Sequence, residues 1–358
     1  MDGRTRSTQH GELPGRAGDT AAARVRSQTN PPYQDPTKRV SRSESIPFAG
    51  NILGSNAGGR GEGSVSEPAK PYNRAHISRA FLAALFAATL AVAASAQTYV
   101  GFDANDYPGD ARLTALHQQF AFTGYWLNNP PGATHSPWVG KRAVLQNTGF
   151  GFLILFNGRI DAQILRNKKL GKSPAALGKQ DAAAAVAAAQ REGFPAGAIL
   201  FLDQEEGGRL LPEQADYLLA WTEAVAATSY RPGVYASGQP VDDEDENGRK
   251  IKLTTIQDIR EHVAKGHLHE IAMWDAQDAC PPAPGCVADP AKVPSLDQSG
   301  TLDLTAWQYA QSPRRPDITK ACGATYARDG NCYAPALAPK FLIDLNAANS
   351  SDPSHGRR

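Results

Sequence analysis

Residues 199–206 combine a short apolar run with a cluster of carboxylic acids. The run reads Ile-Leu-Phe-Leu and leads directly into Asp-Gln-Glu-Glu. Side chains alternate along a strand, so a strand here would place Asp203 and Glu205 on one face and turn Glu206 away. Two neighbouring carboxyls can serve as general acid and stabilising anion, because like charges push their pKa values apart. A second interpretation is that the acids only mark where a buried strand reaches solvent.

Two further acids accompany apolar runs elsewhere in the chain. Asp103 ends the run 98–103, and Asp344 lies in the run 340–346. Each of them alone could be a structural cap. In one closed parallel barrel, the first and last strands are neighbours and the run 198–203 lies across the mouth, so all four acids would meet at the C-terminal opening. Carboxyl pairs suit glycosidic cleavage, in which one protonates the leaving oxygen and another stabilises the cationic transition state.

Aromatic and amide side chains near the ends of the same runs could bind a sugar. Aromatic rings at a barrel mouth can stack on sugar rings, and core packing is the competing interpretation. The aromatic residues in such positions are Tyr125, Trp126, Tyr235, Trp274, Trp307 and Tyr309. We take Tyr125, Tyr235, Trp274, Trp307 and Gln308 as the candidates for substrate binding.

Eight β-rich runs alternate with helical segments or long loops. This alternation predicts an α/β fold with parallel strands, and the number eight predicts a single (β/α)8 TIM-type barrel. The predicted strands span residues 98–103, 122–127, 150–156, 198–203, 233–237, 271–275, 304–309 and 340–346, and the predicted helices span 113–120, 180–192, 212–227 and 255–265. The acidic segment 242–246 is predicted to be a solvated loop. The barrel domain is predicted to span 97–348, with a disordered tail over 349–358.

Residues 1–70 differ in composition from the rest of the chain. They are rich in Gly, Ser, Arg, Pro and Asn and have hardly any apolar clusters. Such a segment cannot bury enough surface to offset its ordering entropy, so we expect disorder. The alternative is that translation starts downstream, near Val65, and that residues 1–64 are not part of the protein.

Residues 71–96 have the features of a secretory signal peptide. Arg74 and Arg79 come before the apolar run 80–94, and Ala-Ser-Ala ends the segment. The run of 15 residues is short for a membrane span, which needs about 20, but an uncleaved anchor is the alternative. Cleavage would leave a secreted or periplasmic protein that begins near Gln97.

All four cysteines lie in the last third of the chain, and they are Cys280, Cys286, Cys322 and Cys332. None lies in a CxxC motif or has a His at zinc spacing, so we expect no metal site. An even number of cysteines in an exported protein favours disulfides. Three pairings are possible, and we expect Cys280–Cys286 with Cys322–Cys332, because both would close short loops.

The net charge of the chain is +1, which gives no global electrostatic reason to expect nucleic acid or an anionic membrane as a partner. The sequence shows no phosphate-binding Gly loop and no nucleophilic Ser or Cys with a partnered His. We therefore expect no cofactor, and we expect a monomer whose partner is a polysaccharide.

Several motifs resemble, in the same order, those of the glycoside hydrolase family 25 lysozymes. They are Val100-Gly101-Phe102-Asp103, Phe201-Leu202-Asp203-Gln204-Glu205, Gly233-Val234-Tyr235, Trp307-Gln308-Tyr309 and Ile343-Asp344-Leu345-Asn346. The opening Gly-Phe-Asp and the Ala-rich helix before Asp203 are more similar to a related bacterial group. That group is the glycoside hydrolase-like barrel once called domain of unknown function 1906. The resemblance covers about residues 98–347.

The resemblance implies a TIM-type barrel that cleaves or binds peptidoglycan-like glycan. It implies that Glu205 is the general acid and that Asp203 orients the N-acetyl group of the substrate as this group attacks the anomeric carbon. Asp103 and Asp344 would shape the pocket and tune the pKa values of the other two acids. The leading hypothesis is a secreted glycosidase of the lysozyme type. A non-catalytic glycan-binding barrel of the cell envelope is the alternative, and a membrane-anchored interaction protein is a third.

Overall fold

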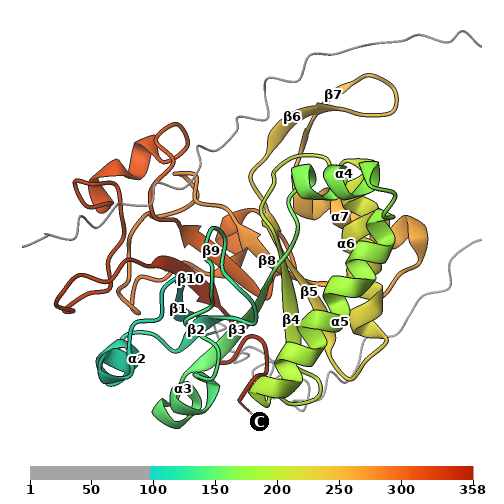
Figure 1. Ribbon diagram of the computed structural model, residues 1–358. Helices are drawn as coiled ribbons and strands as arrows, with labels where there is room; N and C mark the ends of the chain where they lie inside the picture. The colour runs from blue at the N-terminus through green and yellow to red at the C-terminus, as the bar shows by residue number, and fades with distance from the viewer. Residues whose placement is uncertain (1–96, 358) are drawn as a thin grey trace, which may run out of the picture. The chain divides into compact units, whose positions relative to one another are not determined.

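The computed structural model describes residues 97–357, which form a closed barrel of eight strands (Figure 1). The predictions for residues 1–70 and 71–96 lie outside the described residues. The strands are β1 (Tyr99–Asp103), β2 (Phe122–Trp126), β3 (Gly151–Asn157), β4 (Ile199–Gln204), β5 (Arg231–Ser237), β8 (Ala272–Ala276), β9 (Ala306–Ala310) and β10 (Asp344–Ala348). They close in the order β1-β10-β9-β8-β5-β4-β3-β2. The predicted α/β barrel is confirmed.

Helices follow the first five strands of the barrel, and short 3-10 turns stand in the later connections. They are η2 (Asp110–Arg112), α2 (Leu113–His117), α3 (Arg142–Thr148), α4 (Asp161–Lys169), α5 (Pro174–Glu192), α6 (Pro212–Ala226), α7 (Thr255–Gly266), η3 (Leu296–Ser299) and η4 (Lys320–Thr325). Small residues let α5 lie close to α6, since a Cβ at Gly178 would come within 2.2 Å of the Tyr217 backbone oxygen. Among residues 97–357, no helix combines the length and apolar character that a membrane span requires.

The last strand runs against its neighbours, so the prediction of an all-parallel sheet is wrong at this point. β10 pairs antiparallel with both β1 and β9. A parallel strand needs a connection that returns the chain to the other end of the sheet. The β9–β10 connection instead begins and ends at the mouth, where the backbone N–H of Ser312 donates to the Asp344 carboxylate. Asp344 therefore begins β10 and still lies at the mouth, opposite Asp103 in the β1–β10 ladder.

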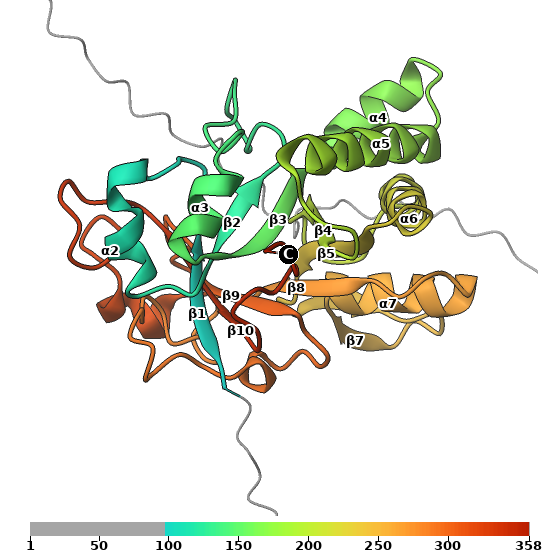
Figure 2. The ribbon, with the colours of Figure 1, turned by 90° about the horizontal axis from the view of Figure 1, so that it is seen from below.

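The C-terminal residues pack under the barrel, at the end opposite the mouth (Figure 2). Ser354 is fully buried, and its hydroxyl accepts a hydrogen bond from the Ile154 backbone N–H at 3.0 Å. Its backbone N–H donates to Phe152 and its backbone oxygen accepts from Ile199. The expected disorder of the tail is therefore wrong for residues 349–357, because they satisfy strand groups that would otherwise be buried without partners.

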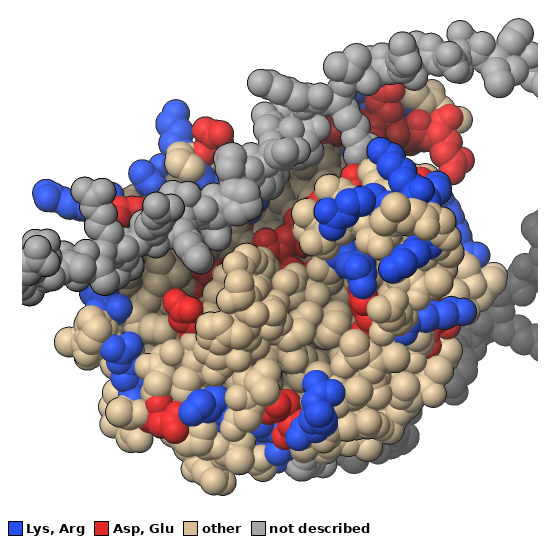
Figure 3. Space-filling model, in the orientation of Figure 1, with Lys and Arg blue, Asp and Glu red and all other residues tan. Residues whose placement is uncertain are grey.

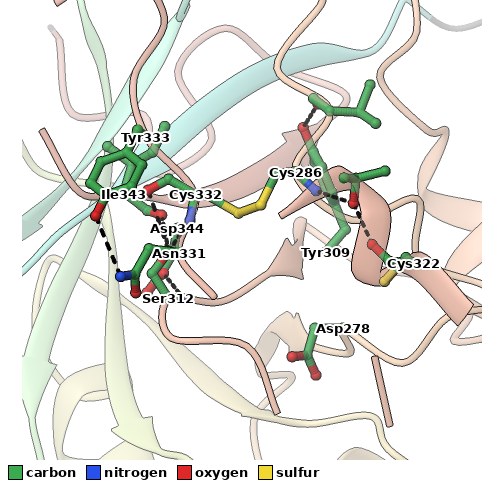
Figure 4. The surroundings of a disulfide bond; sticks show 12 residues. Asp278, Cys286, Tyr309, Ser312, Cys322, Asn331, Cys332, Tyr333, Ile343 and Asp344 are labelled. Carbon is green, nitrogen blue, oxygen red and sulfur yellow. Dashed lines mark hydrogen bonds between the residues drawn. A yellow bond between two sulfur atoms is a disulfide. The ribbon is translucent and has the colours of Figure 1, made fainter. Parts of the chain in front are cut away.

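Both disulfides join one long loop to another. Cys280 pairs with Cys322, and Cys286 pairs with Cys332, with a Cα–Cα distance of 5.4 Å in each pair. The cysteines form disulfides as predicted, but the expected pairing within each loop is wrong. The β8–β9 and β9–β10 connections lie side by side, as the hydrogen bond from Cys280 N–H to the Ile318 oxygen also shows. The bridges thus tie the two connections together (Figure 4).

A hairpin stands where a solvated loop was expected over residues 242–246. Its strands are β6 (Val241–Glu244) and β7 (Lys250–Leu253), which pair antiparallel. Asp242 lies opposite Lys252, and the two side chains form an ion pair at 2.7 Å. Opposite charges on facing strands stabilise a hairpin, which the charge of the segment alone does not reveal.

Candidate active site

Four carboxylic acids meet at the mouth of the barrel, and we call Asp103, Asp203, Glu205 and Asp344 the acid group. Asp103 ends β1, Asp203 lies near the end of β4, and Asp344 begins β10. Glu205 follows β4 directly. The charges of Asp103 and Glu205 act on both Asp203 and Asp344, so the structure brings together the four acids that the sequence analysis selected.

The acid group differs in access to solvent. Asp103 and Asp203 are only 7% and 8% exposed. Asp344 is half-buried, whereas the Glu205 side chain is exposed within the mouth. Figure 3 shows acidic atoms in a hollow near the middle of the face that it draws. Glu205 is therefore the member of the group that a ligand would meet first.

Asp103 is held by a network of amide and aromatic side chains from the inner face of the barrel. Its Oδ1 accepts from Gln308 Nε2 at 3.0 Å and from Asn346 Nδ2 at 2.7 Å. Gln308 in turn accepts from the Tyr235 hydroxyl at 2.7 Å. Asn346 accepts from the Trp274 indole N–H at 2.9 Å. This network fixes the rotamer of Asp103, and its two amide donors stabilise the ionised carboxylate.

The three aspartates of the acid group have raised pKa values. Burial raises the pKa of Asp103, and its hydrogen bonds with Asn346 and Gln308 oppose that rise. Burial raises the pKa of Asp203 and of Asp344 well above the usual range, and the negative charge of Asp103 adds to both shifts. Acids this close do not all ionise together. The two amide donors make Asp103 the aspartate of the group whose ionised form is best stabilised.

Glu205 has a pKa suited to a general acid at neutral pH. Although its side chain reaches solvent, the walls of the mouth remove much of the surrounding water, and this raises the pKa of Glu205 to about 7. The negative charge of Asp103 raises that pKa further, whereas Arg315 and a hydrogen bond with Tyr235 lower it. Glu205 thus holds a proton below about pH 7 and can release it in a reaction.

One wall of the mouth comes from the disulfide-linked loops and was not among the features predicted from the sequence. Arg315 donates to both carboxylate oxygens of Asp278, which is 1% exposed. The charges of Asp278 and Asp344 also raise the pKa of the Tyr326 hydroxyl, after the larger effect of its burial. Asp278 closely follows β8, so the strand-end rule could have found it. Arg315 and Tyr326 lie in an irregular loop and carry no such signal. Figure 4 shows Asp278 and Asp344 near these loops.

Three of the predicted substrate-binding residues lie at the acid group or under it. Tyr235 and Gln308 belong to the network that holds Asp103, and both are buried. Trp274 is fully buried, and its ring lies 4.6 Å from that of Tyr235, centroid to centroid. Trp274 therefore supports the network from below and presents no open face to a sugar.

Tyr125 and Trp307 point away from the acid group, so their predicted place in the substrate site is corrected. The Tyr125 hydroxyl donates to Glu192 at the end of α5, and its ring packs on Phe194. The Trp307 indole N–H donates to the Gln277 backbone oxygen at 2.7 Å, and the ring is fully buried. Trp307 and Gln308 are adjacent in a strand, so only one of the two can face the interior.

Glu206 points away from the acid group, as the alternation of the strand predicts. Its carboxylate accepts from the backbone N–H of Asp161 at 2.9 Å, where α4 begins. It also accepts from the side-chain amides of Gln204 and Gln214. A carboxylate at the start of a helix satisfies unpaired N–H groups there. Glu206 therefore anchors α4 to the end of β4.

The acid group has the chemistry of a proton donor beside a fixed anion. Glu205 can give up a proton near pH 7, and the two amide donors on Asp103 favour a negative charge there. Within residues 97–357, no three His, Cys, Asp or Glu side chains are grouped so that they could hold a metal ion. The arrangement matches what acid-catalysed cleavage of a glycosidic bond requires.

Three solved structures illustrate what the chain is similar to. An uncharacterized B. stearothermophilus protein is 20% identical with a TM-score of 0.44, over 70% of this chain and 95% of that chain. The Tat-secreted protein Rv2525c of Mycobacterium tuberculosis is 11% identical with a TM-score of 0.40, over 70% and 95%. The spore cortex lytic enzyme SleM of Clostridium perfringens is 13% identical with a TM-score of 0.41, over 71% and 68%.

Residues 139–307 match the family model of the Rv2525c-like, glycoside hydrolase-like domain. No curated protein matches the chain. The matched residues run from the segment before α3 into β9 and include Asp203 and Glu205. The resemblance to a glycoside hydrolase-like barrel, inferred from the sequence motifs, is confirmed.

Proposed function

Because residues 139–307 match the family model of the Rv2525c-like, glycoside hydrolase-like domain, we propose that the protein hydrolyses glycosidic bonds in bacterial cell-wall glycan of the peptidoglycan type. The observation that supports this most is Glu205. It is an exposed carboxyl in the mouth of the barrel, and its surroundings raise its pKa to about 7. Surface glutamates have no reason to hold a proton at that pH, whereas a general acid must.

The proposed reaction assigns one task to each acid. Glu205 gives its proton to the leaving oxygen as the bond from this oxygen to the anomeric carbon breaks. Asp203 accepts a hydrogen bond from the N–H of the substrate acetamido group. This bond directs the acetamido oxygen to the anomeric carbon, with which it forms a bond. Asp103, held as an anion by two amides, opposes the positive charge that develops on the sugar. Water then attacks the anomeric carbon, the bond from this carbon to the acetamido oxygen breaks, and Glu205 takes a proton from the water and regains its acid form.

We propose that the protein works outside the cytoplasm, in the periplasm or beyond the cell. Two disulfides form among its cysteines, which is typical of an oxidising compartment. Peptidoglycan is found in the same place. The predicted signal peptide over residues 71–96 would direct the protein there.

A non-catalytic glycan-binding barrel is the second candidate function. The observation in its favour is the burial of Asp103 and Asp203, at 7% and 8% exposure, which leaves little of either carboxyl open to a sugar. Such a protein would bind peptidoglycan in a saturable manner and release no reducing ends.

Replacement of the general acid tests the proposal. In a Glu205→Gln variant, the release of reducing ends from peptidoglycan should fall by about 10²–10⁴-fold, which is the usual contribution of a general acid. The matched control is Glu270→Gln, the same change at an exposed residue that follows α7. Equal release by Glu205→Gln and the parent would refute Glu205 as the general acid, and no release by the parent would refute glycosidase action. Saturable binding without any release by the parent would establish the second candidate.

A further inference from the structure

Lys and Arg side chains gather on α4 and the start of α5, beside the mouth of the barrel. Residues 159–179 include six Lys or Arg and a single Asp, although the net charge of the whole chain is only +1. In Figure 3, blue side chains surround the position that α4 has in Figure 1, at one side of the hollow. The exposed cations are Arg166, Lys168, Lys169, Lys172 and Lys179. We call these five residues the α4 patch.

Most of the α4 patch has no anionic partner within the protein. Lys168 pairs with Glu213 at 2.6 Å. Arg166, Lys169, Lys172 and Lys179 form no ion pair with any residue of the described range 97–357, and their side chains extend into solvent. A group of unpaired cations raises the local concentration of anions, and salt screens this effect. The patch is therefore available to an external anion.

The helix that carries the patch is fixed to the candidate active site. The backbone N–H of Asp161, at the start of α4, donates to Glu206 at 2.9 Å. Glu206 is the neighbour of Glu205 in the chain, so α4 begins at the mouth. Its nine residues extend over about 13 Å at the usual rise of a helix. A polymer that crosses the mouth can therefore reach the patch with groups a few sugar rings away.

The apolar residues of α4 favour a soluble polymer over a membrane as the partner. A helix that lies on a membrane needs a continuous apolar face. On α4 the side chain of Ile164 is buried, and the exposed Ile160 and Leu170 stand at opposite ends of the helix. Between them, Ala162 is the one exposed apolar residue and Leu165 is half-buried, and the other exposed residues of α4 are polar or basic. Distributed positive charge of this kind complements a polymer with recurring anions.

We propose that the α4 patch binds the carboxylate groups of an anionic cell-wall glycan whose sugar backbone lies across the acid group. The identity of the polymer rests on the proposed function. A carboxylated strand would be repelled by an acidic mouth, since like charges oppose its approach. A basic surface beside the mouth holds the substituents away from the acids and lets the sugar backbone enter. The protein should thus bind carboxylated glycan in preference to a neutral one.

The test compares two variants of the full chain with equal net charge. The patch variant carries Arg166→Gln, Lys169→Gln, Lys172→Gln and Lys179→Gln. The control variant carries Lys250→Gln, Lys265→Gln, Lys292→Gln and Lys320→Gln, which are exposed cations elsewhere on the molecule. Binding to peptidoglycan particles is measured by co-sedimentation at low and at physiological salt. In a second comparison, the carboxyls of the particles are converted to methyl amides. Binding of the unchanged parent protein to these particles tests the contribution of the carboxylate charge.

The patch variant should bind the untreated particles about tenfold more weakly than the parent at low salt, since each exposed ion pair adds a small free energy. The control variant should bind the untreated particles as strongly as the parent does. The parent should bind the amidated particles about tenfold more weakly than the untreated particles, as the patch variant does with untreated particles. Equal binding by the two variants, or undiminished binding to amidated particles, would overturn the proposal. The proposal would also be overturned if the protein bound anionic phospholipid vesicles through the patch and did not bind the particles. That result would assign the patch to a membrane.

Binding and cleavage are separate measurements, so the two proposals can fail independently. If the parent co-sediments with the particles, binding depends on the patch and no reducing ends are released, then this inference holds and the catalytic proposal fails. If reducing ends are released but the patch variant binds as strongly as the parent, then the catalytic proposal holds and this inference fails.

Discussion

At the scale of single residues, the acids of the mouth differ because their hydrogen bonds differ. Asp103 accepts from two amides that the barrel interior holds in place. Asp203 has burial and like charges that raise its pKa, with no opposing effect of that kind. Glu205 faces the solvent of the mouth. Similar carboxyls thus acquire different tendencies to ionise from their surroundings.

The rate of glycan cleavage should fall as the pH rises through about 7. Glu205 must carry its proton to act, and its surroundings raise its pKa to about 7, so the active form is lost above that pH. Initial rates of reducing-end release between pH 5 and pH 9 give the profile. The apparent value belongs to the coupled acid group as a whole. A rate that climbs steadily up to pH 9 would contradict the assignment of Glu205 as the acid.

Replacement of Gln308 should weaken catalysis more than substrate binding. A Gln308→Met variant removes a donor to Asp103 and one hydrogen-bond partner of the buried Tyr235 hydroxyl. The loss of a hydrogen bond costs about 0.5–1.5 kcal/mol, so some loss of stability should accompany the effect. We expect kcat to fall about tenfold at a nearly unchanged KM, because a loss of about 1.4 kcal/mol corresponds to a factor of ten. A change confined to KM would show that Gln308 touches the substrate instead.

At the scale of elements, the mouth depends on two long connections that contain little regular structure. The β8–β9 connection carries Asp278, and the β9–β10 connection carries Arg315 and Tyr326. The bridges Cys280–Cys322 and Cys286–Cys332 are the covalent links between them. The barrel strands position the acid group, whereas the disulfides position the wall that faces it.

Peptide mapping without reduction should recover Cys280 linked to Cys322, and Cys286 linked to Cys332. A Cys280→Ser/Cys322→Ser variant should lose up to about 4 kcal/mol of stability, the chain-entropy value for a closed loop of 42 residues. Thermal unfolding of the parent with and without reductant provides the comparison. Recovery of a Cys280–Cys286 peptide would contradict the pairing.

At the scale of the whole molecule, the C-terminal residues complete the closed barrel. Ser354 joins β3 to β4 at the end opposite the acid group. The two ends of the barrel therefore have different tasks, since one holds the candidate active site and the other is sealed by the tail (Figure 2).

A Ser354→Ala variant should be less stable by about 1–3 kcal/mol, because the Ile154 backbone N–H would remain buried without its acceptor. Urea unfolding measures the difference. Ser351→Ala is the matched control, since Ser351 is only half-buried. Cleavage rates should change little in either variant, as neither residue lies near the mouth. Equal stability of the two variants would show that the tail does not seal the barrel.

The sequence by itself determined the features that depend on neighbours in the chain. Apolar runs predicted the eight strands, and strand alternation placed Asp203 and Glu205 together and turned Glu206 away. The same rule could have shown that Trp307 and Gln308 face opposite sides. Asp103, Asp203 and Glu205 were found because the C-terminal ends of parallel strands converge on one opening. Asp344 reaches the same opening for another reason, since it begins the reversed strand β10.

Only the tertiary structure decided what depends on residues far apart in the chain. The reversed direction of β10, the cysteine pairing and the buried tail each join segments separated by many residues. Local propensity carries no information about such partners. The hydrogen bonds that stabilise the ionised form of Asp103 come from β9 and β10, more than 200 residues away in the sequence. The presence of the acids is therefore a property of the sequence, and their different surroundings are a property of the fold.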